Sequence, residues 1–238
     1  NFRRVHEVVA DGQIGSPHLL RITSRDPQPP PIDYVRVSGG IFLDMTIHDF
    51  DMARFLMGRE VESVYAAAGV MVDPRIGEAG DVDTAVITLH FAGGALGVID
   101  NSRQAVYGYD QRLEVFCSKG VAEAGNQAAD TVVRGDTTGM HAALPPRFFM
   151  QRYPETYVEE VRAFLACVAN DSTPLVTGRD GRLSVILGYA AGNPNGPAAG
   201  DHPPGKGLQG GFQQRTHSGQ CLRIDPGGPA SHDQRSPR

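Results

Sequence analysis

One stretch, Gly39-Gly-Ile-Phe-Leu-Asp44-Met-Thr-Ile-His48-Asp-Phe-Asp51, decides how we expect this chain to fold. Two glycines break the chain, and the apolar residues that follow predict one buried helix over 41–57, closed by Gly58. In such a helix, residues four apart lie on the same face, so Asp44 and His48 should stack one above the other. A histidine beside a carboxylate can accept and return a proton near neutral pH. This pair is therefore the candidate catalytic site.

Other interpretations of this motif stay open when only the residue types are considered. A histidine on an apolar helix is more often a core residue, satisfied here by Asp44 or by a carbonyl. Asp49 and Asp51 are weaker site candidates, and Asp51 can equally pair with Arg54 at the surface. Asp44, His48 and Asp51 are metal-ligand types, but no fourth residue has convincing spacing, so we predict no metal site.

The remaining elements follow from hydrophobic periodicity. Many short strands joined by short turns predict an α+β fold with an open, mostly antiparallel sheet flanked by helices. Thr84, Thr88 and His90 fall on the polar face of one strand. The predicted helices cover 2–10, 41–57, 154–168 and 178–191, and the predicted strands cover 18–25, 62–72, 84–91, 95–101, 111–118, 121–125 and 130–134. We expect the helix over 154–168 to belong to the core.

Composition changes after the last predicted helix. Residues 193–238 are rich in glycine and proline and lack apolar periodicity, so they cannot bury enough surface to offset their ordering entropy. We expect one domain over 1–192, followed by a disordered and aberrant tail over 193–238. The tail spells Gly-x-Gly-x-x-Gly at 205–210, but no strand precedes it and no helix follows it, so we do not expect it to bind a dinucleotide.

The bulk properties exclude several classes of partner. A net charge of -5 and a pI near 5.9 give no basic surface for nucleic acid or for an anionic membrane. The chain has no run of 18 apolar residues, so we predict no membrane span. Three isolated cysteines, Cys117, Cys167 and Cys221, fit a reducing compartment, and we expect a cytoplasmic location.

Four short sequence segments resemble those of a known family: 38–51, Gly77-Glu-Ala-Gly-Asp-Val-Asp83, Asp100-Asn-Ser-Arg103 and Tyr107-Gly-Tyr-Asp110. Over residues 1 to about 191, the chain resembles the Gfo/Idh/MocA family of NAD(P)-dependent sugar and cyclitol dehydrogenases, most closely the branch that acts on inositols. In that family a dinucleotide-binding domain with a catalytic Lys comes first, and the second domain is an open sheet flanked by helices. The resemblance implies that this chain is the second domain alone, a fragment without cofactor-binding residues.

The resemblance also implies roles for individual residues. The reaction would convert myo-inositol to 2-keto-myo-inositol, with hydride passing to NAD held by the absent first domain. His48 would be the general base and Asp44 its partner. The substrate-binding residues would be Asp26, Tyr107, Tyr109 and Tyr157, with Tyr107 and Tyr109 not distinguished from each other.

Two alternative functions stay open, and we also expect the chain to associate with copies of itself. The chain could instead serve another sugar or cyclitol dehydrogenase of the same family, or it could be a non-catalytic oligomerisation module. In the family, the open sheet face commonly supports oligomers, so we expect a homo-oligomer in which Thr84, Thr88 and His90 are interface candidates. The expected ligand is a small polyol, and we expect this chain to be inactive without the first domain.

Overall fold

The structure is a computed structural model that describes residues 1–193 and 220–223. Its helices are α1 (Phe2–Ala10), α2 (Ile32–Val35), α3 (Ile41–Asp44), α4 (Thr46–Met57), α5 (Pro74–Glu78), α6 (Phe149–Arg152), α7 (Pro154–Asn170) and α8 (Gly178–Gly192). Its strands are β1 (Pro17–Arg25), β2 (Val61–Gly69), β3 (Thr84–Phe91), β4 (Leu96–Ser102), β5 (Asp110–Cys117), β6 (Gly120–Ala124), β7 (Val133–Asp136), β8 (Gly139–Ala142) and β9 (Gln220–Arg223). No helix in this described part is both long and apolar enough to cross a membrane.

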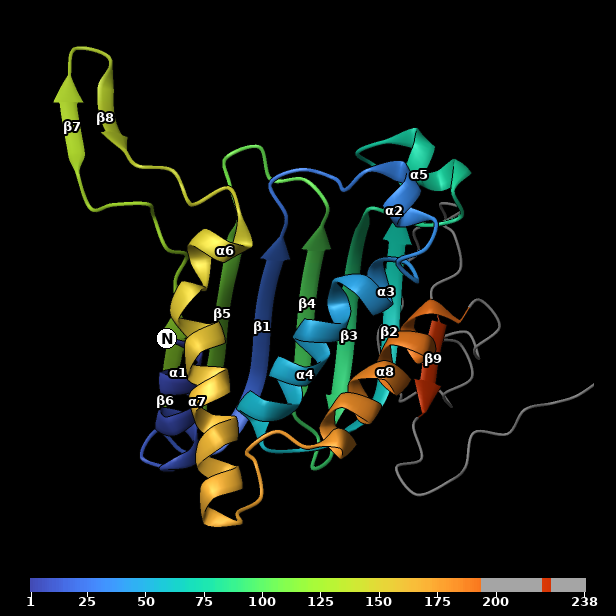
Figure 1. The fold of residues 1–238 in the computed structure, drawn as a ribbon, viewed down its shortest axis with the longest axis vertical. Coiled ribbons are helices and arrows are strands. Elements are labelled where there is room, and N and C mark those ends of the chain that lie inside the picture. Colours follow the sequence, from blue (N-terminus) through green and yellow to red (C-terminus); the bar gives the residue numbers. More distant parts are fainter. Residues whose placement is uncertain (194–219, 224–238) are drawn as a thin grey trace, which may run out of the picture.

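The main sheet has the strand order β6-β5-β1-β4-β3-β2-β9. The neighbours β1 and β4 run parallel, whereas the other neighbouring pairs are antiparallel. Helices α1, α4 and α8 lie on one face of this sheet, as Figure 1 shows, and they contact β6, β1 and β2 respectively. The predicted α+β class with an open, mostly antiparallel sheet is confirmed.

The core lies between the helices and the sheet. In β1, β3 and β5, buried apolar residues alternate with more exposed ones, because successive strand side chains point to opposite faces. Phe50 and Leu56 of α4 belong to one hydrophobic cluster with Leu20, Ile87 and Ile99 of the strands, and all five are almost fully buried. Each such side chain contributes roughly 1.5–3 kcal/mol relative to exposure. The opposite sheet face has no helical cover in the described part.

The structure differs from the expectations at α7 and around residues 130–134, and it leaves the tail untested. The helix over 154–168 was predicted to be core, and this is wrong, because no residue of α7 is buried. In place of the strand over 130–134, a fully exposed hairpin of β7 and β8 projects from the domain (Figure 1). Of the predicted tail, only β9 and Asn193 belong to the described residues, so its expected disorder and the glycine motif at 205–210 lie outside them. The domain boundary at 192 stays a prediction.

The two glycines before α3 make the turn that sets its direction. Gly40 has φ +84° and ψ 170°, a region that only glycine occupies readily. A Cβ at this position would lie 2.9 Å from Oδ1 of Asp81, which accepts the backbone N–H of Ile41 at 3.0 Å. The start of α3 therefore depends on a glycine that leaves room for this carboxylate.

We expect Gly40→Ala to lower the free energy of unfolding by roughly 2 kcal/mol or more, since backbone strain adds to the contact with Asp81. Urea denaturation measures the change. Gly94→Ala is the matched control, because Gly94 also has positive φ (+87°) but a Cβ there would meet nothing within 4 Å. Equal losses in the two variants would contradict the importance of the Asp81 contact.

Candidate functional site

The helix predicted over 41–57 is broken at Met45. α3 ends at Asp44, Met45 has φ −112° and ψ −62°, and α4 begins at Thr46. The backbone N–H of His48 bonds to the carbonyl of Met45 at 3.2 Å, three residues back rather than four. No hydrogen bond among the described residues joins Asp44 to His48. The expected stacking of the two side chains on one uninterrupted helix is therefore wrong, although they remain one turn apart in the chain.

Asp44 is held by two other side chains. The hydroxyl of Tyr34 donates to its Oδ1 at 2.6 Å, and Nη1 of Arg103 donates to its Oδ2 at 2.9 Å. Arg103 is only 1% exposed and also donates from Nη2 to Asp81 at 3.2 Å, while its buried Nε has no partner among the described residues. Charge-assisted bonds of this kind are short and strong, so they fix the position of the carboxylate.

Asp26 lies at the end of β1 in the same electrostatic environment. Its backbone N–H bonds to the carbonyl of Ser102 at 2.9 Å, which holds it beside the end of β4. Burial raises the pKa of the Asp26 carboxyl to about 6, while Arg103 lowers that pKa and Asp44 raises it. The structure thus brings together two predicted site residues, Asp26 and Asp44, around one guanidinium that the sequence analysis assigned no role.

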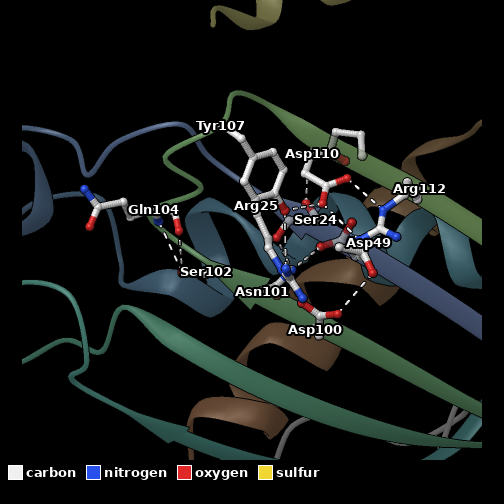
Figure 2. A network of polar contacts seen from close by, with 12 residues as sticks. Ser24, Arg25, Asp49, Asp100, Asn101, Ser102, Gln104, Tyr107, Asp110 and Arg112 are labelled. Atoms are coloured by element: carbon white, nitrogen blue, oxygen red, sulfur yellow. Dashed lines mark hydrogen bonds and ion pairs between the residues drawn. The ribbon is translucent and has the colours of Figure 1, made fainter. Parts of the chain in front are cut away.

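Asp49, the residue after His48, is buried and belongs to the polar network of Figure 2. Nδ2 of Asn101 donates to its Oδ2 at 2.8 Å, and the hydroxyl of Ser24 also bonds to it. Thr46 donates to Oδ1 of Asn101 at 2.6 Å, so the first turn of α4 is tied to β1 and β4. Burial raises the pKa of Asp49 to about 7, although the bonds from Asn101 and Ser24 lower this pKa. A buried carboxyl of this kind is a common mark of a functional site.

The two tyrosines of the 107–110 turn have different surroundings. The Tyr107 hydroxyl donates to Asp110 at 2.5 Å and accepts from Arg25 at 3.4 Å (Figure 2). Arg25 in turn pairs with Asp100 at 2.7 Å. Through these bonds, Tyr107 contacts side chains on the exposed side of β1 and β4. The structure does not bring Tyr107 to Asp26 and Asp44.

Tyr109 lies with the acidic cluster instead. Its ring packs edge-on against that of Tyr153, with centroids 6.1 Å apart. Burial raises the pKa of Tyr109 well above its ordinary value, and nearby Tyr153 and Asp26 raise it further. Tyr157, on α7, is exposed and also raises that pKa. The predicted substrate residues Asp26, Tyr109 and Tyr157 therefore share one neighbourhood.

His48 is exposed on α4, and its ring makes no hydrogen bond to any described residue. The interpretation as a satisfied core histidine is wrong for this structure. An exposed imidazole without a bonded partner can contact a ligand directly. It is free to accept a proton from such a ligand.

Asp51 lies elsewhere on α4. It accepts a bond from Ser184 at 3.4 Å and lines a hollow of 280 Å³ between α4 and the start of α8. Arg54, the residue expected to pair with Asp51, bonds to Glu60 and Asp180 instead. Within residues 1–193 and 220–223, no group of His, Cys, Asp or Glu is arranged to hold a metal ion.

Four residues of this neighbourhood had no role in the sequence analysis: Tyr34, Asp81, Arg103 and Tyr153. Arg103 belongs to one of the quoted motifs, and an arginine two residues after a predicted strand was the available signal. Tyr34 follows a proline-rich loop, and nothing in its spacing points to Asp44. Only the fold brings these residues together, since their positions in the sequence are far apart.

Comparisons with known proteins identify the family of this chain. The model of the family described as "GFO/IDH/MocA C-terminal domain" matches residues 2–123. The myo-inositol 2-dehydrogenase of Thermotoga maritima is 59% identical over 191 residues, which cover 80% of this chain and 57% of that protein. The chain thus spans little more than half the length of this relative.

Solved structures show the same likeness. A myo-inositol dehydrogenase from Corynebacterium glutamicum superposes with a TM-score of 0.76 at 37% identity, covering 80% of this chain and 59% of that one. The scyllo-inositol dehydrogenase from Lactobacillus casei with bound NAD(H) and scyllo-inositol superposes with a TM-score of 0.73 at 25% identity, covering 80% and 58%.

We expect Asp49→Asn to change how stability depends on pH. The pKa of Asp49 is about 7 when folded, against an ordinary value of 3.8. Between these values the folded state keeps a proton that the unfolded state releases, so the free energy of unfolding falls as the pH rises. Asparagine does not titrate. The stability of Asp49→Asn relative to wild type should therefore increase from pH 4 to pH 8 by a few kcal/mol, at about 1.4 kcal/mol per pKa unit.

Chemical denaturation across this pH range tests the expectation. Asp180→Asn is the control of opposite sign, because bonds from the backbone and hydroxyl of Thr177 lower the pKa of Asp180 to about 2. The contribution of the Asp180 carboxylate to the free energy of unfolding is present above the ordinary pKa of Asp and is lost only as the pH falls toward 2. The Asp180→Asn difference should stay constant from pH 4 to pH 8, and a constant difference for Asp49→Asn would contradict the buried-acid account.

Proposed function

The chain belongs to the GFO/IDH/MocA C-terminal domain family, and from this premise we propose that it forms the substrate-binding half of an NAD-dependent inositol dehydrogenase. The observation that carries the proposal is the cluster of Asp26, Asp44, Arg103 and Tyr109, together with the exposed His48 one turn after Asp44 in the chain. An inositol offers little apolar area, so a site for it needs several fixed donors and acceptors. The guanidinium and the tyrosine hydroxyl can donate, and the carboxylates can accept.

In the proposed reaction, a ring CH–OH group becomes a ketone. His48 accepts the hydroxyl proton while the hydride of the same carbon leaves for the cofactor, so the substrate loses two electrons and two hydrogens. Asp44, which Tyr34 and Arg103 hold in position, would stabilise the resulting imidazolium electrostatically. Asp26, Tyr109 and Tyr157 would bind the remaining hydroxyl groups.

The described residues do not fit a dinucleotide. A pyrophosphate site of the usual kind needs a glycine-rich turn between a strand and a helix, and the described ranges contain no such turn with the Gly-x-Gly-x-x-Gly spacing. We therefore assign NAD to a preceding domain, and the catalytic Lys with it. Support comes from the family description as a C-terminal domain and from the Lactobacillus casei structure with bound NAD(H).

A chimera tests the proposal. We would join the part of the Thermotoga maritima relative that precedes its matched segment to residues 1–193 of this chain. We expect this chimera to oxidise inositols with NAD, and His48→Ala to lower its turnover by about 10²-fold or more, since a general base is lost. Because His48 is exposed, the His48→Ala substitution should not change the unfolding temperature of the chimera.

His141→Ala is the matched control, because His141 is an exposed histidine on the projecting β7–β8 hairpin. It should keep the wild-type turnover. A preference for glucose over myo-inositol and scyllo-inositol would move the assignment to another sugar dehydrogenase of the family. A near-normal rate for His48→Ala would contradict its role as the base. NAD binding by the 238-residue chain alone would contradict the assignment of the cofactor to a preceding domain.

We also propose that the open sheet face joins copies of this chain. Strand register places Leu19 beside both Leu96 and Phe116, and Phe116 beside Val121, which makes an apolar row across four strands. Thr84, Thr88 and His90 lie on the neighbouring strand of the same face. Phe116→Asp should shift the chain to a smaller species in sedimentation velocity, whereas Val132→Asp, at an exposed site before the hairpin, should not. An unchanged distribution for Phe116→Asp would refute this interface.

A cytoplasmic location completes the proposal. Cys117 and Cys167 are free thiols, as expected in a reducing compartment. Detection of the native protein in a fractionated cell of its source would test this location.

A further inference from the structure

Gly108 separates two tyrosines that contact different sides of the main sheet. Tyr107 bonds to side chains on the open face, whereas the ring of Tyr109 packs against Tyr153, which directly precedes α7 on the helical side (Figure 1). In an extended strand, residues two apart point to the same side. Gly108 changes this direction with φ +128°, and a Cβ there would lie 2.6 Å from the carbonyl oxygen of Pro145. The turn therefore depends on a glycine to direct its two tyrosines apart.

The hydroxyl of Tyr107 closes this turn on the open face. It donates to Oδ2 of Asp110 at 2.5 Å, so a single side-chain bond spans Gly108 and Tyr109 (Figure 2). Asp110 is the first residue of β5, and it is only 2% exposed. A buried carboxylate that loses a hydrogen-bond donor is left undersatisfied, which is costly. The bond from Tyr107 thus holds the turn against the start of β5.

The partners of Tyr107 rest on three adjacent strands. Arg112 donates to both oxygens of Asp110, at 2.8 and 3.0 Å. Arg25 of β1 donates to the Tyr107 hydroxyl at 3.4 Å and to Asp100 of β4 at 2.7 Å. Several charge-assisted bonds of this kind fix the geometry of the side chains that make them. We call Arg25, Asp100, Asp110 and Arg112 the open-face anchor.

On the other side of the turn, the main chain of Tyr109 is bound and its side chain is available. The backbone N–H of Tyr109 bonds to the carbonyl of Pro146 at 2.8 Å, and Nδ2 of Asn126 donates to the Tyr109 carbonyl at 3.1 Å. The Tyr109 side chain stays partly exposed, and its hydroxyl makes no hydrogen bond to a described residue. This hydroxyl is therefore free to bond to a ligand in a direction that the turn sets.

We propose that Tyr107 is a positioning residue for substrate binding, because through the open-face anchor it fixes the turn that presents Tyr109 to the polyol. This inference rests on the proposed function. The two tyrosines, which their sequence motif does not distinguish, thus have different tasks. Tyr109 contacts ring hydroxyls, whereas Tyr107 contacts no ligand and acts only through Tyr109.

Direct contact between Tyr107 and the polyol is the competing role, and the geometry disfavours it. A tyrosine hydroxyl has one proton to donate. Tyr107 uses that proton on Asp110, while Arg25 donates to the same hydroxyl oxygen. No hydrogen bond among the described residues connects Tyr107 to Asp26 or Asp44. Its hydroxyl is thus already engaged on the face away from the site.

Tyrosine ring ¹³C NMR of the 238-residue chain tests the positioning without requiring activity. The chain has seven tyrosines, and the Tyr109 signal is the one that disappears in Tyr109→Phe. We expect this signal to shift in Tyr107→Phe, because the ring of Tyr109 changes its seat against Tyr153. Tyr189→Phe serves as the reference variant, since Tyr189 is exposed on α8 and makes no hydrogen bond to a described residue. It should leave the Tyr109 signal in place. An unshifted Tyr109 signal in Tyr107→Phe would overturn the proposal.

Steady-state kinetics of the chimera with the Thermotoga maritima segment give the second test. We expect Tyr107→Phe to raise KM for myo-inositol by about 10-fold at unchanged kcat, the scale of one weakened hydrogen bond to the ligand. Tyr109→Phe should have an effect of similar size. The double variant should be no worse than Tyr109→Phe alone, because a residue that acts through another gives non-additive losses. Additive losses would make Tyr107 a direct ligand contact and overturn the proposal.

The outcomes separate this inference from the proposed function. An active chimera in which Tyr107→Phe keeps the wild-type KM would overturn the positioning role and leave the dehydrogenase proposal intact. A chimera that oxidises no polyol, together with a shifted Tyr109 signal in Tyr107→Phe, would refute the function and still support the control of Tyr109 by Tyr107.

Discussion

A single buried guanidinium holds the site of this domain together. Arg103 bonds to Asp44 at the end of α3 and to Asp81 before β3, and Asp81 in turn accepts the first backbone N–H of α3. These bonds connect the ends of two neighbouring strands to the short helix that precedes His48. Breaking a buried pair of this kind leaves an uncompensated charge, which typically costs about 3–5 kcal/mol. The position of Asp44 therefore depends on Arg103.

The cluster carries more acidic than basic groups, and this imbalance has consequences. Asp26, Asp44 and Asp81 surround one guanidinium, and Asp49 lies behind them without an ion pair of its own among the described residues. Burial raises the pKa values of Asp26 and Asp49 toward neutrality. A fold that keeps such carboxyls in its interior loses stability at neutral pH. Functional sites commonly retain groups of this kind because binding or chemistry requires them.

Many strands and helix starts of this structure can be predicted from residues close together in the sequence, whereas features that depend on tertiary contacts cannot. Alternation in Thr84–Phe91 and the glycine pair at 39–40 predict a strand and a helix start, because burial and backbone freedom act within a few residues. The break at Met45 was missed, since a helical apolar pattern continues across it. α7 was predicted to be core because an apolar stripe does not reveal which surface covers it. Arg103 was missed because its partners lie 22 and 59 residues away in sequence.

The choice between Tyr107 and Tyr109 shows the same limit of local pattern. The two residues flank one glycine, and only the tertiary contacts separate them, with Tyr107 bonded to Asp110 and Tyr109 packed on Tyr153. A crystal structure of the active chimera with bound myo-inositol tests the central claim most directly. We predict ring hydroxyls within hydrogen-bond distance of Asp26, Tyr109 and the His48 imidazole. An inositol bound against Tyr107 on the open sheet face, away from His48, would contradict this claim.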